Sequence, residues 1–360
     1  MAKIIVATTE SERQAIYRFR YQVYVEEMQK QPRSADHLAR TLTDALDETA
    51  TLLYMTQGDQ IIAALRRSRL DHCRLPDGLE QTLALAQFAD AFPRSRLSLS
   101  SRFVVAAEWR NSLAPGSLIL ATYRMAREQG IQFDFLHAAP WLLPFYKSLG
   151  YRCYAPHFLE SDVGLQIPQV LLLEDLDYLQ AVRSPLLRVA RQFPNRSEAR
   201  DWFAKLPAVH PLPIPPTIPG WQTLDADTVQ QLMQAATVYS LPPGQAVVRL
   251  GDVTNAMFIV LTGEVEVSYV NSQTDPAASA VAILKPGQTF GETNLFNPSP
   301  SLEQAVTLTP TDLLILPKSA LAKLMKTIPA TMCQILLNAS RSLCDRYIPS
   351  YNALSNRNVA

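Results

Sequence analysis

The first half of the chain alternates apolar strands with amphipathic helical stretches. A strand at residues 4–8 is followed by Thr9 and Glu12, a capping box that predicts the start of a helix. That helix has one apolar stripe, formed by Ile16, Phe19 and Val23. Further strands are expected at 51–56, 60–66, 97–107, 131–137 and 167–173, and helices at 115–129 and 140–149. This alternation predicts a mixed α/β sheet.

A proline-rich connector separates this half from a second half with a different pattern. Six of the thirteen residues from Pro207 to Pro219 are proline, so the segment forms neither a helix nor a central strand. Beyond it, residues 241–317 predict short strands, after a lead helix at 225–239 and before closing helices at 318–325 and 330–347. The expected segments are a first domain at 1–205, a linker at 206–220, a second domain at 221–350 and a tail at 351–360.

Composition and charge narrow the class of protein. Lys plus Arg and Asp plus Glu each number 33 among 360 residues, so no global field favours binding to nucleic acid. No run of eighteen apolar residues predicts a membrane span, and the apolar stretch at the start is too short for a signal peptide. We therefore expect a cytoplasmic protein. The four cysteines show no C-x-x-C spacing and the five histidines no zinc pattern, so no metal is expected.

Five short motifs occur in order within residues 3–180. They are RYQVYVEE at 20–27, DALD at 44–47, LR at 65–66, SRF at 101–103 and FYKSLGY at 145–151. The last resembles a motif of the GNAT superfamily of N-acyltransferases. The others resemble its branch of acyl-homoserine-lactone synthases and long-chain N-acyl amino acid synthases. The resemblance implies an N-terminal mixed-sheet α/β domain that moves an acyl group from a thioester to an amine.

The resemblance also implies roles for individual residues. The donor, acyl-CoA or an acyl carrier protein, is expected to bind at Phe103, Val104, Val105, Arg110, Gly116 and Ser117, where a strand end and a helix start offer backbone donors. The small amine acceptor is expected to bind at Arg20, Tyr24, Arg66, Ser101 and Arg102. Tyr146 matches the tyrosine that protonates the leaving thiolate, a role suited to a phenol.

Two departures from this branch affect those roles. The related synthases carry a glutamate, thought to act as the base, two residues before the serine of the SR pair, where this chain has Leu99. The base is then expected from Asp44, from Asp47 or from water. The phosphate loop R-x-x-G-x-G reads RNSLAPG at 110–116. A carrier protein, with a single phosphate on its arm, would demand less of this loop than coenzyme A.

Each candidate residue also has a purely structural explanation. Tyr146 is then a packing aromatic, and Arg20 and Tyr24 flank the core. Asp44 and Asp47 are then turn or cap residues, Arg66 and Arg102 are solvated strand residues, and Gly116 and Ser117 only begin a helix.

The second half carries glycines spaced for the turns of a β-roll. Positive φ is expected at Gly244, Gly251, Gly263, Gly287 and Gly291. The segments 241–267, 284–292 and 311–316 resemble cyclic nucleotide-binding domains. The resemblance implies a C-terminal β-roll with flanking helices, so the fold class of the whole chain is α+β.

The nucleotide pocket implied by this resemblance is incomplete. Phe290, Gly291 and Glu292 are present, and the glutamate would take the ribose 2′-hydroxyl. The phosphate-binding arginine falls at Ser301 or Leu302, and there is no arginine between Arg249 and Arg341. Its loss predicts binding weaker by about 30- to 1000-fold. We expect a degenerate sensor, either a ligand-free interaction or homodimerisation module or a domain for another ligand. Tight binding of cyclic AMP or GMP is the third alternative.

The leading functional hypothesis is an N-acyltransferase that acts on a small amine or amino acid and is modulated by the second domain. The alternative is a non-catalytic ligand-sensing or scaffold protein, favoured by the charges lost at Leu99 and at Ser301 or Leu302. The two hypotheses differ in one structural expectation. In an enzyme, Arg20, Asp44, Asp47, Arg66 and Arg102 should converge beside a splayed strand near residues 104–106.

Overall fold

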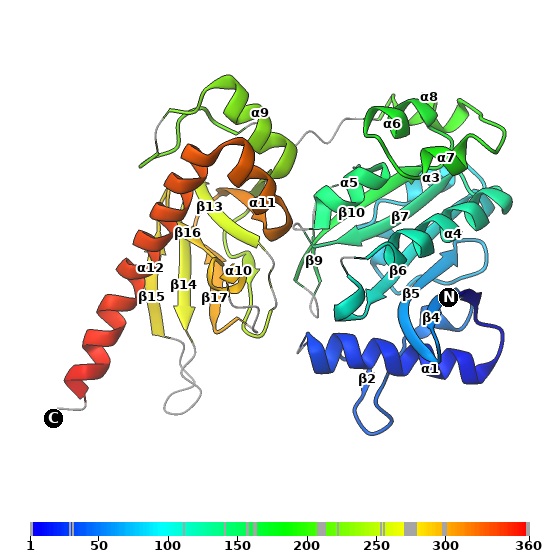
Figure 1. Ribbon diagram of the computed structural model, residues 1–360, viewed down its shortest axis with the longest axis horizontal. Helices are drawn as coiled ribbons and strands as arrows, with labels where there is room; N and C mark the ends of the chain where they lie inside the picture. The colour runs from blue at the N-terminus through cyan, green and yellow to red at the C-terminus, as the bar shows by residue number, and fades with distance from the viewer. Residues whose placement is uncertain are drawn as a thin grey trace. The chain divides into compact units, whose positions relative to one another are not determined.

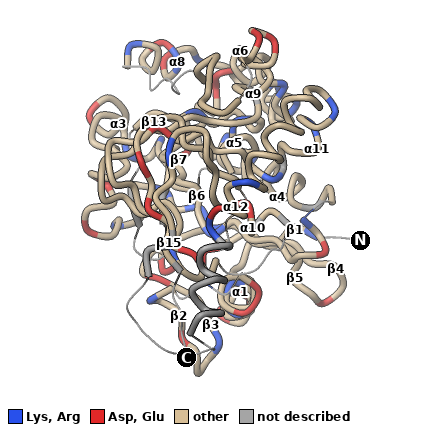
Figure 2. The backbone as a smooth tube through the Cα atoms, turned by 90° about the vertical axis from the view of Figure 1, so that its left-hand side faces the viewer, with Lys and Arg blue, Asp and Glu red and all other residues tan. Residues whose placement is uncertain are grey.

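The structure, a computed structural model, describes residues 3–357 except 29, 31, 111, 140–141, 156–157, 161–163, 207–213, 222, 253, 255, 270–278 and 297–300. The chain forms two compact units that divide near residue 209 (Figure 1). Most of the proline-rich connector lies outside the described residues. Figure 2 shows Lys and Arg interspersed with Asp and Glu along the described chain. Within the described part, every helix is too short or too polar to cross a bilayer.

An eight-stranded sheet forms the centre of the first unit. Its strands, in spatial order, are β1 (Lys3–Val6), β4 (Thr51–Gln57), β5 (Gln60–Arg69), β6 (Leu97–Val105), β7 (Phe133–Ala138), β10 (Gly164–Leu172) and β8 (Tyr151–Cys153), with β9 (Phe158–Glu160) paired to β10. Every pair is antiparallel except β6 with β7, which is parallel. The predicted mixed sheet is confirmed.

Helices cover both faces of this sheet (Figure 1). The capping box of Thr9 and Glu12 starts α1 (Glu10–Tyr21), as predicted, and Ile16 packs against Leu52. On the other face, α4 (Ala114–Glu128) packs Leu118 against Leu53. Neighbouring strand residues point to opposite faces, so β4 supplies both cores.

Short elements complete the first unit. They are the turn of π-helix at Gln22–Glu27, the hairpin β2 (Ala35–Asp36) and β3 (Thr41–Leu42), the 3₁₀ turns at Ala45–Asp47, Arg94–Arg96 and Ala107–Trp109, and the helices α2 (Leu79–Thr82), α3 (Ala86–Ala91), α5 (Leu143–Leu149), α6 (Leu176–Ala181), α7 (Leu187–Ala190) and α8 (Glu198–Phe203). Phe88 of α3 makes edge-on contacts with the rings of Phe133, Phe135, Tyr154 and Trp202.

Strands β6 and β7 separate in the middle of the sheet. Their pairing covers only Leu97–Leu99 with Phe133–Phe135, although β6 continues to Val105 and β7 to Ala138. On its other side β6 stays paired with β5, through a bulge at which Arg102 adopts a φ of 53°. The β7-facing edge of β6 is therefore not paired with β7 from Ser100 onwards, and we call this region the splay.

Two four-stranded antiparallel sheets form the second unit. One contains β11 (Thr237–Leu241), β18 (Thr311–Pro317), β13 (Ala256–Thr262) and β16 (Thr289–Phe290); the other contains β12 (Ala246–Val248), β17 (Glu303–Thr307), β14 (Val265–Tyr269) and β15 (Ser279–Leu284). The helices are α9 (Ala226–Ala235), α10 (Thr293–Phe296), α11 (Lys318–Thr327) and α12 (Pro329–Arg357). The predicted β-roll with flanking helices is confirmed.

Two helix boundaries differ from the sequence-based expectation. The lead helix ends at Ala235 rather than 239, because Thr237–Leu241 pair with β18 as a strand. The last helix continues to Arg357, so the segment predicted as a tail from 351 begins as helix. Strand pairing with a distant segment overrode the local helical pattern in the first case.

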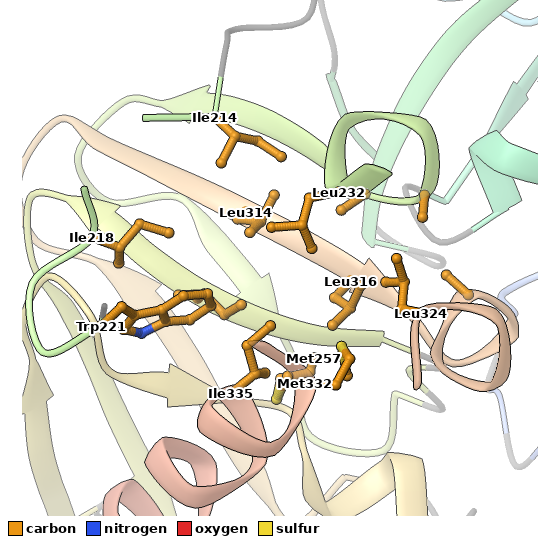
Figure 3. Close-up of a cluster of buried hydrophobic side chains, with 14 of the residues drawn as sticks. Ile214, Ile218, Trp221, Leu232, Met257, Leu314, Leu316, Leu324, Met332 and Ile335 are labelled. Carbon is orange, nitrogen blue, oxygen red and sulfur yellow. The ribbon is translucent and has the colours of Figure 1, made fainter. Parts of the chain in front are cut away.

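The core of this unit packs α9, α11 and α12 against β13 and β18 (Figure 3). Leu232, Met257, Leu314, Leu324 and Ile335 are all buried within it. The five glycines predicted to need positive φ have φ values between 76° and 90°. At Gly287 a β-carbon would also lie 1.8 Å from the carbonyl oxygen of Pro219. Glycine is therefore required there by two independent constraints.

Candidate functional site

Three residues expected to bind the acceptor and the two aspartates expected as candidate bases converge in one network of ion pairs. Arg20 Nη1 lies 2.8 Å from Asp47 Oδ1, and Arg66 Nη1 lies 3.1 Å from Asp47 Oδ2. Asp44 pairs with Arg66, and its Oδ2 lies 2.8 Å from Arg102 Nη2. The residues come from α1, β5, the bulge of β6 and the turn before β4. Only the fold brings them together.

The network extends from the buried core to the surface. The side chains of Arg20, Arg66 and Asp47 are at most 3% exposed, whereas those of Arg102 and Asp44 are 22% and 25% exposed. Three guanidinium groups face two carboxylates, so the network carries one net positive charge. This excess charge is available to an anionic group that approaches Arg102 from solvent.

Asp44 and Asp47 are also cap residues, as the structural explanation expected. The Asp44 side chain accepts from Leu46 N at 3.1 Å, and Asp47 Oδ2 accepts from Asp44 N at 3.0 Å. Thr43 Oγ1 donates to Asp47 Oδ2 at 3.1 Å. The caps orient both carboxylates toward the arginines.

Burial opposes ionisation of Asp44, but the charges of Arg66 and Arg102 and their hydrogen bonds lower its pKa to about 2. Burial likewise opposes ionisation of Asp47, yet Arg20 and Arg66 lower its pKa as well. A carboxylate with so low a pKa is a weak base at neutral pH. The surroundings of these two residues therefore favour orienting the arginines over accepting a proton.

Ser101 and Tyr24 complete the expected acceptor set. Ser101 Oγ accepts from Arg66 Nε at 2.9 Å. The guanidinium of Arg102 lies 5.6 Å from the centre of the Tyr24 ring, within the range of a cation–π contact. Tyr24 lies in the π-helical turn, and such turns often occur at functional sites.

Tyr146 lies among aromatic rings near the splay. Its ring centre is 5.6 Å from that of Tyr151 and 5.1 Å from that of Phe145. Phe145 in turn lies parallel to Phe103 of β6, at 6.3 Å. Burial raises the pKa of Tyr146, and the charges of Tyr24 and Asp134 raise it further. The phenol is therefore protonated at neutral pH, as a proton donor must be.

The residues expected to hold the acyl donor lie at the end of β6 and the start of α4. The side chains of Val104 and Val105 are buried on opposite faces of the sheet. Arg110, expected to contact a phosphate, instead forms an ion pair with Glu27 and donates to the carbonyl oxygen of Val105 at 3.1 Å.

One of the two amides expected to bind phosphate at the start of α4 is already engaged. Ser117 N already donates to Leu113 O at 3.1 Å within the helix. The space around Gly116 is open. Arg110 and the Ser117 amide, both expected to contact a phosphate, are thus already bonded within the protein.

In the second unit, Phe290, Gly291 and Glu292 lie together at the end of β16. The Phe290 ring stacks on Phe258 with centres 4.9 Å apart. Glu292 is fully buried and forms an ion pair with Arg346 of α12, which also donates to Thr289 O at 3.0 Å. Burial raises the pKa of Glu292, against the opposing charge of Arg346. The carboxylate expected to bind a ribose is thus already engaged.

Neither Ser301 nor Leu302, the two positions where the phosphate-binding arginine was expected, carries a charge. Ser301 is buried, and its hydroxyl donates to Glu303 O at 2.9 Å, whereas Leu302 is 75% exposed. Glu303 is buried nearby, and its charge acts on Glu292. Residues 297–300, which precede Ser301 in the sequence, lie outside the described residues.

Several polar residues of both units were missed by the sequence analysis. Arg346 and Asp134 belong to no motif, and Tyr151, the last residue of the FYKSLGY motif, was assigned no role; their importance becomes visible only through their contacts. Arg67 is buried beneath α4, where it donates to Thr122 O and to Gln129. Among the described residues no three His, Cys, Asp or Glu side chains gather as ligands for a metal ion.

The fold and this site define an acyltransferase-type unit followed by a β-roll. Residues 15–174 match the family model of the N-acyl amino acid synthase FeeM. Residues 238–328 match the model of the cyclic nucleotide-binding domain. Both resemblances read from the motifs are thereby confirmed. The first unit is an N-acyltransferase domain, and a cyclic nucleotide-binding domain follows it.

Solved structures similar to the chain divide between the two units. The CoA-dependent acyl-homoserine lactone synthase BjaI, solved with SAM and isopentyl-CoA, is 16% identical, and the match covers 57% of this chain and 99% of that one at a TM-score of 0.42. FeeM, an N-acyl amino acid synthase from uncultured soil microbes, is 16% identical. The match covers 52% of this chain and 98% of FeeM at a TM-score of 0.41.

For the second unit, a cyclic nucleotide-binding domain from Methylobacillus flagellatus KT is 23% identical, and the match covers 39% of this chain and 78% of that one at a TM-score of 0.33. No curated protein sequence matches the chain.

Proposed function

We propose that the first unit transfers an acyl group from a thioester to the amino group of a small amine that carries a carboxylate, an amino acid. The observation that carries this proposal is the net positive charge of the network, which reaches solvent at Arg102. The carboxylate of an amino acid is the group that such an arginine binds best. The match to an N-acyl amino acid synthase supports the same acceptor class.

In this proposal each residue of the site has a separate role. Arg102 holds the acceptor carboxylate, the buried Arg66 adds its positive charge from beneath, and Asp44 and Asp47 orient the two arginines. Tyr146 donates a proton to the sulfur of the leaving thiolate. The unpaired edge of β6 along the splay supplies backbone donors to the acyl thioester. The proton of the attacking amine leaves through water.

We propose further that the donor needs few phosphate contacts. Arg110 is engaged by Glu27, and Ser117 N is bonded within its helix. An acyl carrier protein, or the pantetheine portion of acyl-CoA, fits this sparse phosphate site. Replacing acyl-CoA by the matching acyl-pantetheine should then change kcat/KM by less than about tenfold, the value of one charge-assisted hydrogen bond.

The test uses the full chain with a panel of acyl-CoAs, acyl carrier protein thioesters and amino acids. Thiol release and mass spectrometry of the N-acyl product are measured together. Product with amino acids, but not with the matching amines that lack the carboxylate, supports the proposal. If no donor releases thiol faster than it does without protein, the result favours the alternative of a non-catalytic ligand-sensing or scaffold protein.

For the second unit we propose a role in assembly or regulation that does not use a cyclic nucleotide. Glu292 is bound by Arg346, and Glu303 lies buried nearby, so a cyclic phosphate would approach two carboxylates and one arginine. No Lys or Arg occurs in the sequence between Lys285 and Lys318. Isothermal titration with cyclic AMP and cyclic GMP tests this, and a sub-micromolar Kd for either would overturn it.

A further inference from the structure

Asp134 lies at the point where β6 and β7 separate. It pairs in register with Ser98, one residue before the last pair of the two strands, Leu99 with Phe135. Its side chain lies on the face of the sheet that α4 covers, since its partner Tyr151 packs in the same cluster as Tyr123 and Ala126 of that helix. Asp134 is therefore a carboxylate beside the splay, on the face opposite the ion-pair network.

Hydroxyl groups satisfy this carboxylate. Ser98 Oγ donates to its Oδ1, and the Tyr151 hydroxyl donates to its Oδ2 at 2.6 Å. Asp134 is 5% exposed, and no Lys or Arg among the described residues forms an ion pair with it. The nearby guanidinium of Arg67 is instead bonded to Thr122 O and to Gln129. Burying a carboxylate without an ion-pair partner costs stability, so its position calls for a functional explanation.

The carboxylate is connected to Tyr146 through Tyr151. The ring of Tyr151 meets the ring of Tyr146 edge-on, at 5.6 Å and 77°. Burial, then the charges of Tyr24 and Asp134, raise the pKa of Tyr146. Within the described residues the Tyr146 hydroxyl has no hydrogen-bond partner, so it is available to a bound ligand. The Tyr146 ring packs edge-on against the rings of Tyr151 and Phe145.

We infer that Asp134 and Tyr151 are positioning residues that hold the Tyr146 hydroxyl toward the sulfur of the acyl donor at the splay. This inference rests on the proposed function. In the reaction, the amine nitrogen forms a bond to the thioester carbon and the carbon–sulfur bond breaks. The sulfur takes the phenol proton of Tyr146, and the proton lost by the amine returns to Tyr146 through water. The products are an amide and a free thiol.

The test varies the leaving group of the donor. An aryl thiolate leaves readily because its thiol has a low pKa, whereas an alkyl thiolate needs a proton more. In Tyr146→Phe, kcat with an alkyl thioester should fall about 100-fold and kcat with the aryl thioester of the same acyl group far less. Tyr151→Phe and Asp134→Asn should show the same selective loss at about 10-fold, with KM for the acceptor unchanged.

Tyr123→Phe is the matched control. Tyr123 is a buried tyrosine of the same hydrophobic cluster, and its hydroxyl donates to Leu173 O at 2.5 Å. Tyr123→Phe should lower the melting temperature as Tyr151→Phe does. It should lower kcat by the same factor with the alkyl and the aryl thioester, or not at all. A merely structural role for Tyr151 predicts that its variant behaves like this control.

The outcomes separate the inference from the proposed function. If the unaltered chain transfers no acyl group from either thioester, the proposed function fails. If it does, and the Tyr151→Phe and Asp134→Asn variants lose the same factor with both thioesters, the positioning role is wrong. If Tyr146→Phe itself shows no dependence on the leaving group, Tyr146 is not the acid, and the inference falls with it.

Discussion

Arg346 of the last helix forms a fully buried ion pair with Glu292, the residue that the family resemblance leads one to expect at a nucleotide ribose. The two residues are 54 positions apart in the sequence. Their pairing links α12 to the end of β16, where Arg346 also bonds Thr289 O. We expect it to hold the last helix against the roll.

A double-mutant cycle tests this link. Arg346→Leu leaves the buried carboxylate of Glu292 without its cation and should destabilise the second unit by about 3 to 5 kcal/mol. Arg346→Leu combined with Glu292→Leu removes both charges and should recover most of that loss. Urea unfolding measures Arg346→Leu, Glu292→Leu and the double variant. Additive losses in the double variant would mean that the two side chains do not interact.

Replacing Arg102 should weaken acceptor binding selectively. Arg102→Gln removes the solvent-facing cation of the network, so KM for an amino acid should rise about 10- to 100-fold while kcat changes little. The control is Arg69→Gln, which removes an arginine of β5 that pairs with Asp71 at 2.7 Å outside the network. Steady-state kinetics compare KM for the amino acid in the two variants. An equal change in both would contradict the assignment of Arg102 to acceptor binding.

The ion pairs of Asp44 should make stability depend on pH in the acidic range. The pKa of Asp44 is lowered from 3.8 to about 2 in the folded chain, so the ionised form is favoured by folding. Its contribution, about 2 kcal/mol, is complete above pH 4 and is lost as the pH falls through about 2. Asp44→Asn should therefore destabilise the first unit at pH 7 but have little effect near pH 2. Denaturant unfolding at both values measures the difference, and an equal effect at both would contradict the ion pairs.

Gly287→Ala should destabilise the second unit by at least about 2 kcal/mol, because a φ of 90° strains any other residue and the added carbon would overlap Pro219 O. Gly244→Ala is the control, since its φ is 78° but nothing lies within 4 Å of the added carbon. The difference between their melting temperatures isolates the steric contribution. Equal losses would show that backbone strain alone accounts for the requirement.

Much of the fold could be predicted because it depends on local chemistry. The capping box at Thr9 and Glu12 and the turn glycines of the roll occur where expected, since a cap needs only neighbours and a positive φ needs only the absence of a β-carbon. Periodicity likewise located the longer strands and helices, but it missed the short helices α2, α3, α6, α7 and α8 of the first unit. The family motifs indicated both units, and the family models confirm them.

The site was only partly accessible from the sequence. Arg20, Asp44, Asp47, Arg66 and Arg102 were expected as a set, but which arginine pairs with which carboxylate follows from the β6 bulge and the turn before β4. The engagement of Arg110 by Glu27 could not be foreseen, because a motif does not specify a residue's ion-pair partner.

The sequence by itself determined the two units, their order and the residue types available to each site. Tertiary structure decided the contacts among residues far apart in the chain. It ended the lead helix early by pairing Thr237–Leu241 with β18, and it placed Arg346 on Glu292 and Tyr151 on Asp134. Such contacts depend on the packing of whole elements rather than on local preference, and a buried charge selects whichever partner that packing places within reach.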